Sequence, residues 1–225
     1  MVKPFFTVPP LENGDRLTRS EFECRYAAMP HVKKAELIEG KVYVASPVRI
    51  VNHGRPHAQM IFWLGVYCAA TPGVDIADNA TVRLDADNEP QPDCLLRIEP
   101  EFGGTSRISA DGYVEGAPEL IVEVAASSAA YDMDEKLRVY RRNGVQEYLV
   151  WQVDDDRLDW FSLQSGRYTN LEPEADGIIR SRIFPGLWLD IDGLLNGNLA
   201  ELLATVQSGV STAEHQIFAD RFTQK

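Results

Sequence analysis

The chain has 225 residues, 44% of them hydrophobic and 25% charged, which is enough apolar material for the core of one large globular domain. Its 22 Lys and Arg residues are outnumbered by 34 Asp and Glu residues, so the formal net charge is −12 at pH 7. This acidic balance opposes binding to nucleic acid through surface charge alone.

The first third of the chain predicts two helices separated by a β-hairpin. Thr18 and Glu21 have the spacing of a capping box, in which two side chains satisfy the free N–H groups at a helix start. Pro56 suits the first turn of a helix, where its missing N–H would have no partner anyway. The expected elements are a helix over residues 19–28, a hairpin over residues 36–44 that turns at Glu39-Gly40 and closes at Pro47, and a helix over residues 56–71.

The middle of the chain predicts strands. Residues 74–84 alternate like a half-buried strand, and residues 91–98 form another with Pro92 at its start, where a missing N–H matters least. Residues 99–117, rich in Gly and Ser, predict a loop that covers or flanks a site. The loop leads into residues 119–126, an apolar run typical of a strand covered on both faces of a sheet.

The C-terminal half predicts further helices and a second hairpin, which gives an α/β or α+β organisation. Asp132 with Glu135 suits a helix start and Asn143-Gly144 a helix end, and the polar end of the chain is expected to fray. In order, we expect a helix over residues 133–143, a hairpin of residues 148–153 and 158–163, a helix over residues 199–206, and a domain of residues 1–207 followed by a polar tail of residues 208–225.

The cysteine pattern and the apolar runs bear on where the protein resides. Cys24, Cys68 and Cys94 are odd in number and widely spaced, which favours reduced thiols in a cytoplasmic protein. Residues 1–6 lack the apolar core of a signal peptide, and no apolar run approaches the ~20 residues that span a bilayer. We therefore expect neither secretion nor membrane insertion.

Glu123 is the one misfit of the apolar strand. Because an unpaired carboxylate there is costly to bury, a metal ion or an ammonium group is its expected partner. If the strand that begins after Asp93 lies alongside, two carboxylates meet, and a hard divalent cation between them makes this tolerable. Such a site is typical of a magnesium-dependent phosphodiesterase, in which the ion polarises the phosphate and activates a water. The alternative for Asp93 is turn chemistry after Pro92.

Lys136 is the ammonium group best placed to reach Glu123. On a helical wheel at about 100° per residue, Lys136 flanks the apolar arc formed by Met133, Leu137 and Tyr140. The short connection from the strand requires this helix to pack near Glu123. The alternative is a side chain that extends along the helix rim to water.

Other polar side chains have simpler explanations. His57 lies on the apolar face of its helix and is more often a satisfied core residue than a catalytic one. His53 is four residues away, but no third clustered ligand supports a zinc site. Arg138, Arg141 and Arg142 are most simply a solvated helix face, and they are also the best candidates for phosphate contacts on this acidic chain.

Several motifs together resemble a known family. Pro92-Asp93, followed thirty positions later by Glu123, resembles the PD-(D/E)XK nuclease pattern. More specifically, the chain over about residues 18–203 resembles the Uma family of restriction-endonuclease-like proteins. The segments that carry this resemblance are residues 36–40, 92–93, 116–124, 134–137, 140, 144–148 and 184–187.

The resemblance implies a restriction-endonuclease-like α/β fold, a mixed sheet flanked by helices with an N-terminal hairpin extension. It also implies an endonuclease that hydrolyses DNA with Mg²⁺ or Mn²⁺ bound by Asp93 and Glu123. In the superfamily a lysine two positions after the second acid orients the attacking water or neutralises developing charge. This chain has Ala125 there, so the resemblance assigns that role to Lys136. The resemblance also points to Glu36 as an extra metal ligand or as a residue that holds a water. The alternative is that Glu36 occupies an exposed position of the hairpin.

A competing hypothesis is a catalytically inactive module that keeps the nuclease fold for self-assembly or protein binding. The net charge of −12 and Ala125 in place of the superfamily lysine favour it. Fold-level analogy alone does not separate the two hypotheses. For the nuclease we expect a homodimer, because duplex cleavage by this kind of fold usually needs two sites.

Overall fold

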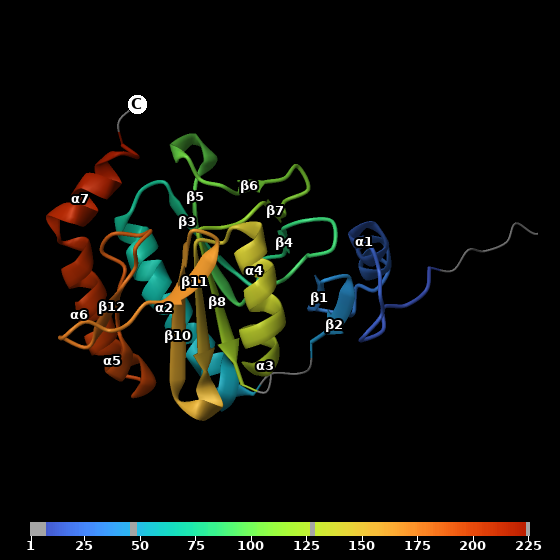
Figure 1. The fold of residues 1–225 in the computed structure, drawn as a ribbon, viewed down its shortest axis with the longest axis horizontal. Coiled ribbons are helices and arrows are strands. Elements are labelled where there is room, and N and C mark those ends of the chain that lie inside the picture. Colours follow the sequence, from blue (N-terminus) through green and yellow to red (C-terminus); the bar gives the residue numbers. More distant parts are fainter. Residues whose placement is uncertain (1–7, 46–48, 127–128, 224–225) are drawn as a thin grey trace, which may run out of the picture.

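A six-stranded mixed sheet forms the centre of the computed structural model, which describes residues 8–45, 49–126 and 129–223 (Figure 1). Its strand order is β11-β10-β9-β8-β5-β3, and only β8 and β9 run parallel among these neighbours. The strands are β3 (Val74–Asp78), β5 (Cys94–Ile98), β8 (Leu120–Ala125), β9 (Glu147–Gln152), β10 (Arg157–Gln164) and β11 (Arg167–Asn170).

Strand β8 has all six of its residues buried, as expected for a strand covered on both faces. Alternation sends Leu120 and Val122 toward one face, and Ile121 and Ala125 toward the other. Glu123 shares the face of Ile121 and Ala125, so its carboxylate points to the side of the sheet opposite the larger apolar core.

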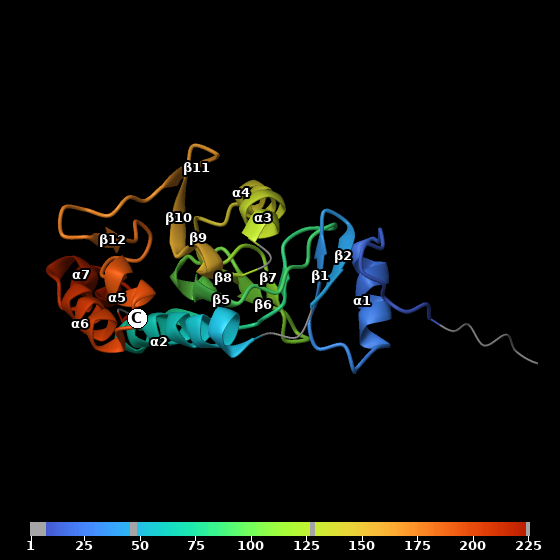
Figure 2. The same ribbon diagram turned by 90° about the horizontal axis from the view of Figure 1, so that it is seen from below.

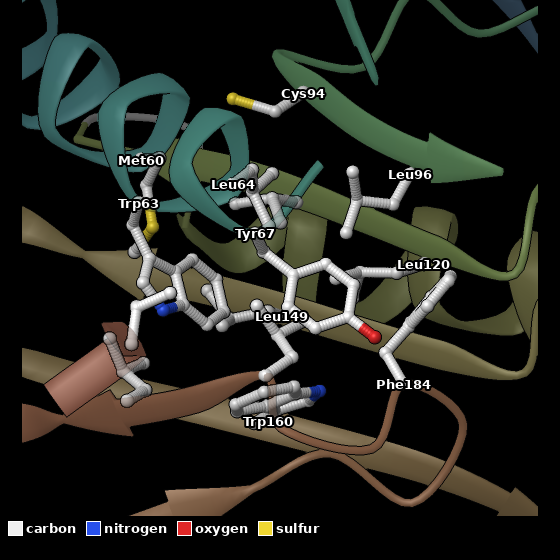
Figure 3. Close-up of a cluster of buried hydrophobic side chains, with 14 of the residues drawn as sticks. Met60, Trp63, Leu64, Tyr67, Cys94, Leu96, Leu120, Leu149, Trp160 and Phe184 are labelled. Atoms are coloured by element: carbon white, nitrogen blue, oxygen red, sulfur yellow. The ribbon is translucent and has the colours of Figure 1, made fainter. Parts of the chain in front are cut away.

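Helices cover both faces of the sheet, and Figure 2 shows α2 and α4 on opposite sides of it. The larger core lies under α2, where Trp63, Leu64 and Tyr67 pack against the sheet and Phe184 (Figure 3). This is the expected mixed sheet flanked by helices. The helices are α2 (Arg55–Ala70), α3 (Ala129–Tyr131), α4 (Leu137–Asn143), α5 (Ile191–Leu195), α6 (Leu199–Val210) and α7 (Ala213–Asp220), and the hairpin of β12 (Ile178–Arg180) and β13 (Trp188–Asp190) lies beside α6.

The N-terminal unit lies at one side of the molecule (Figure 1) and consists of α1 (Arg19–Ala27), β1 (Ala35–Ile38) and β2 (Lys41–Val44). Thr18 caps α1 by accepting from the N–H of Glu21, as the capping box predicted. The hairpin turns at Glu39-Gly40, where both residues have positive φ. The expected strand end at Pro47 and the N-terminal residues 1–6 lie outside the described residues.

A second, three-stranded sheet corrects two predictions. It has the order β4-β7-β6 and consists of β4 (Val82–Arg83), β6 (Arg107–Ile108) and β7 (Val114–Glu115). The single strand expected over residues 74–84 therefore breaks at Asn79, whose φ is 50°. The loop expected over residues 99–117 holds two strands and a 3-10 turn at Pro100–Phe102. Strands of two residues are too short to show an alternating pattern.

The polar tail expected after residue 207 is folded. Helix α6 continues to Val210, and α7 follows after a short turn. Phe218 and Phe222 of this segment are buried, with ring centroids 4.9 Å apart, and Phe222 also packs 5.1 Å from Phe102. The buried aromatic side chains thus hold this segment against the rest of the fold, although its polar residues had predicted that it would fray. Within the described part of the chain, no helix has the length and apolarity needed to cross a bilayer.

Glu147 at the start of β9 makes stability depend on pH. Its carboxylate is fully buried and accepts from the Ser181 hydroxyl and the Arg182 N–H, both at 2.7 Å. Burial raises its pKa to about 7, even though these hydrogen bonds act to lower it. The folded state therefore keeps a proton that the unfolded state releases near pH 4.5, so this contribution to stability is complete below pH 4.5 and is lost as the pH rises through 7.

We expect Glu147→Gln to remove this pH dependence. The difference in unfolding free energy between wild type and variant should change by about 3 kcal/mol between pH 4.5 and 7. Urea unfolding followed by tryptophan fluorescence at several pH values measures it. Glu115→Gln, which alters a partly exposed carboxylate, serves as the control. A constant difference across this pH range would contradict the assignment.

Candidate active site

One cleft of about 1230 Å³ collects all four residues that the sequence singled out, Glu36, Asp93, Glu123 and Lys136. Its walls come from the N-terminal hairpin, from β8, from the helical segment that follows β8, and from η1, a π-helical turn over Ile50–Gly54 that leads into α2. The segment of residues 99–117 was expected to cover or flank a site; none of these residues, all of them described, lines the cleft, so the segment does not cover it.

Glu123 lies at the floor of the cleft with only 3% of its surface exposed. Its Oε1 accepts from Lys136 Nζ and from the Tyr140 hydroxyl, each at 2.8 Å. Burial raises the pKa of Glu123, and the negative charges of Asp93 and Asp132 add to this against the pull of Lys136. The buried carboxylate therefore has the ammonium partner that its apolar surroundings demanded.

Lys136 is enclosed by carboxylates. Besides Glu123, its Nζ lies 3.0 Å from Glu36 Oε1 and 3.5 Å from Asp132 Oδ1, and its side chain is 3% exposed. Burial opposes the positive charge, but these carboxylates outweigh it and hold the pKa of Lys136 above its usual value. Glu36 is itself 7% exposed, which rules out the alternative of an exposed hairpin position.

The helix that carries Lys136 starts earlier than expected. It begins with α3 and passes through η3, a π-helical turn over Asp132–Lys136, before α4. Asp132 is not at the helix start, because α3 already begins at Ala129; it is buried inside the helix, four residues from Lys136. The predicted N-cap is therefore wrong, since the short polar side chain pairs with the lysine. π-Helical turns of this kind often occur at functional sites.

Asp93 stands one residue before β5, and the antiparallel pair Cys94↔Val122 brings it beside Glu123. Its Oδ2 accepts from the Val124 N–H at 2.8 Å, and its Oδ1 accepts from Lys34 Nζ at 2.9 Å. Burial would raise the pKa of Asp93, but the contacts with His53 and Lys34 hold it well below its usual value. The strand pairing that the two-carboxylate site required is present.

Two histidines lie against Asp93. His53 Nε2 is 3.2 Å from Oδ2 of Asp93, and the Nδ1 of the same ring is buried with no partner among the described residues. His57 Nε2 lies 3.0 Å from the Asp93 carbonyl oxygen and 2.9 Å from Asp78 Oδ1. His57 is thus a satisfied, half-buried side chain, as the sequence favoured.

Sequence reasoning missed Lys34, His53 and Tyr140 as members of the site. Tyr140 carried a usable signal, because it lies four residues after Lys136 on the same helical face. The four-residue spacing of His53 and His57 was a weaker signal that His53 belongs to the site. Lys34 had no sequence signal, because only the docking of the N-terminal unit brings it to Asp93.

The three arginines proposed as phosphate contacts lie outside the cleft. Arg138, Arg141 and Arg142 line a separate pocket of about 370 Å³ together with Glu39 and Gly166. Arg142 is paired with Glu39 at 3.2 Å, and Arg138 with Asp134. Arg138 thus forms an ion pair on the helix surface, and Arg142 forms one with the N-terminal hairpin.

The donor set suits magnesium or manganese. Across residues 8–45, 49–126 and 129–223, no group of three or more His, Cys, Asp or Glu side chains is arranged to hold a metal ion, so a cation here would have two protein ligands and water. Mg²⁺ usually keeps several waters and binds one or two carboxylates, which Asp93 and Glu123 offer at one cleft. No described residue donates to Oε2 of Glu123, and a cation there would offset the crowding of negative charge that raises the pKa of this residue.

Comparisons with known proteins identify the family and the fold of the chain. Residues 19–192 match the Uma2 family, described as "Putative restriction endonuclease". A search of curated proteins gives no match. Among solved structures, the chain resembles the crystal structure of "a putative nuclease belonging to DUF820 from Anabaena variabilis", with a TM-score of 0.57, 14% identity, and coverage of 77% of this chain and 96% of that one. The fold is shared, and because the family match spans well over half of the sequence, the chain belongs to the Uma2 family.

Proposed function

We propose that this protein is a Mg²⁺- or Mn²⁺-dependent endonuclease that hydrolyses phosphodiester bonds of DNA in the cleft. The supporting observation is that adjacent strands bring Asp93 and Glu123 to one cleft beside a buried lysine. Membership of a family of restriction-endonuclease-like proteins supports nucleic acid as the substrate. Because cutting both strands of a duplex usually needs two sites, the proposal includes a homodimer.

Asp93 and Glu123 would hold the cation, which supplies a Lewis acid for the phosphate and a water of lowered pKa as nucleophile. Lys136 keeps Glu123 and Glu36 in place, because its Nζ lies within 3.0 Å of both carboxylates. The Tyr140 hydroxyl donates to the same oxygen of Glu123. Glu36 is oriented by the Gln91 N–H at 2.7 Å and lines the cleft, where it would accept a proton or hold a water.

A DNA-nicking assay tests the proposal. Purified protein should convert supercoiled plasmid to nicked and linear forms with Mn²⁺, and EDTA should stop the reaction because no other group supplies the Lewis acid. Glu123→Gln should lower the rate by at least ~100-fold, whereas Glu115→Gln, outside the cleft, should match wild type.

Two outcomes would count against the nuclease. Equal nicking by wild type and Glu123→Gln would mean that a contaminant cuts the DNA. A protein that cuts neither duplex nor single-stranded DNA with Mg²⁺ or Mn²⁺ would favour the inactive module for self-assembly or protein binding, in line with the net charge of −12.

A further inference from the structure

The two lysines of the cleft are placed differently, and this difference indicates which of them meets the substrate. Building on the proposed nuclease function, we propose that Lys34 is the residue that contacts a DNA backbone phosphate next to Asp93, and that Lys136 positions the carboxylates without touching DNA.

The ammonium group of Lys136 is committed to carboxylates of the protein itself. Its Nζ donates to Glu123 Oε1 at 2.8 Å, and carboxylate oxygens of Glu36 and Asp132 lie 3.0 Å and 3.5 Å away. Its side chain is 3% exposed, so a phosphate would have to displace a buried ion pair to reach it. Lys136 is therefore a positioning residue.

Lys34 has a free donor and faces the cleft. Its Nζ donates to Asp93 Oδ1 at 2.9 Å and to Asn79 Oδ1 at 3.1 Å, which leaves one of its three N–H groups without a partner among the residues that the structure describes. Its side chain is 24% exposed, eight times the fraction of Lys136, and it lines the cleft. A phosphate oxygen at this donor would lie beside the carboxylate proposed to hold the cation.

Two further cations line the cleft that holds Lys34. Lys33 comes from the N-terminal unit and Arg49 directly precedes η1. Of the carboxylates that line the same cleft, Glu36, Glu123 and Asp132 are paired with Lys136, and Asp93 with Lys34. Lys33, Lys34 and Arg49 are therefore the cations that can attract a phosphate backbone at this cleft of a chain whose net charge is −12.

Binding of DNA without metal tests the role of Lys34 separately from catalysis. The probe is a fluorescently labelled 20-base-pair duplex in EDTA, followed by anisotropy at several salt concentrations. Lys34→Gln should weaken binding by about 10-fold and reduce the slope of log affinity against log salt by about 1. Arg107→Gln removes the same charge from a 74% exposed side chain outside the cleft, and should change affinity less than about 2-fold.

A second pair of variants guards against misfolding, because Lys34→Gln leaves the buried Asp93 carboxylate with one partner fewer. In Asp93→Asn the charge of residue 93 is absent, so a further Lys34→Gln change leaves no buried carboxylate without its partner. The double variant Asp93→Asn/Lys34→Gln should bind DNA about 10-fold more weakly than Asp93→Asn. Lys34→Arg, which keeps the charge, should restore most of the binding.

The possible failures are distinct. If Lys34→Gln and the double variant bind DNA like their parents while Mn²⁺ affinity falls, Lys34 only positions Asp93 and the inference is overturned. If the Lys34 variants bind DNA like their parents but the wild type cleaves DNA, the proposed nuclease function is retained and only the role of Lys34 is overturned. If the wild type neither binds nor cleaves DNA, both are overturned.

Discussion

Replacing Lys136 with methionine should destabilise the fold by about 3–5 kcal/mol at neutral pH. The ammonium group is the shared partner of three carboxylates from β1, β8 and η3, so its removal leaves Glu36, Glu123 and Asp132 buried close together without the cation. Methionine fills a similar volume, so the loss reports the charge and not a cavity. Urea unfolding followed by tryptophan fluorescence measures the difference.

The deficit of this variant should shrink in acid, because protonation neutralises carboxylates that no longer have a cationic partner. Lys33→Met is the matched control: Lys33 is exposed, and its Nζ donates to the Pro30 carbonyl oxygen. It should change stability by less than about 0.5 kcal/mol. A loss below about 1 kcal/mol for Lys136→Met would show that the three carboxylates do not depend on this lysine.

Substituting either Asp93 or Glu123 should remove most of the metal affinity. Each carboxylate is one of the two proposed to hold the ion from neighbouring strands, so Asp93→Asn and Glu123→Gln should each weaken Mn²⁺ binding by at least ~100-fold. Both replacements keep the size of the side chain and remove its negative charge. Isothermal titration calorimetry measures the affinity.

Asp176→Asn is the control for these titrations, since Asp176 is an exposed carboxylate paired with Arg180 outside the cleft. It should bind Mn²⁺ like wild type. If both cleft variants also bind Mn²⁺ like wild type, the two carboxylates do not hold the ion.

The sequence predicted the centre of the site because the signal there is local. A carboxylate inside an apolar strand needs a cation, and helical periodicity placed Lys136 on the face that meets it, at 2.8 Å in the structure. The neighbouring carboxylate of Asp93 was expected only if β5 and β8 paired, and they do.

The remaining partners depend on contacts between distant segments. Lys34 and Asp93 are 59 residues apart, and His53 and Asp93 are 40 apart. Their meeting requires the N-terminal unit and η1 to dock on the end of the sheet, and no periodicity or capping pattern encodes that docking. The arginines of α4 had two interpretations, a solvated helix face or phosphate contacts, and the structure has the side chains of Arg138 and Arg142 partly exposed and paired with Asp134 and Glu39.

The fold was predictable to a similar degree. Long elements with a full pattern, such as α2 and the buried strand β8, lie where they were expected. The two-residue strands β6 and β7 were missed because they show no alternation. For the C-terminal end a signal did exist, since Phe218 and Phe222 are four residues apart and share a helical face.

Crystals grown with Mn²⁺, measured near the absorption edge of manganese, test the central claim most directly. We predict an anomalous peak in the cleft, within about 2.5 Å of one carboxylate oxygen of Asp93 and one of Glu123. A peak that contacts only one of these carboxylates, or that lies outside the cleft, would contradict a cation held jointly by the two acids.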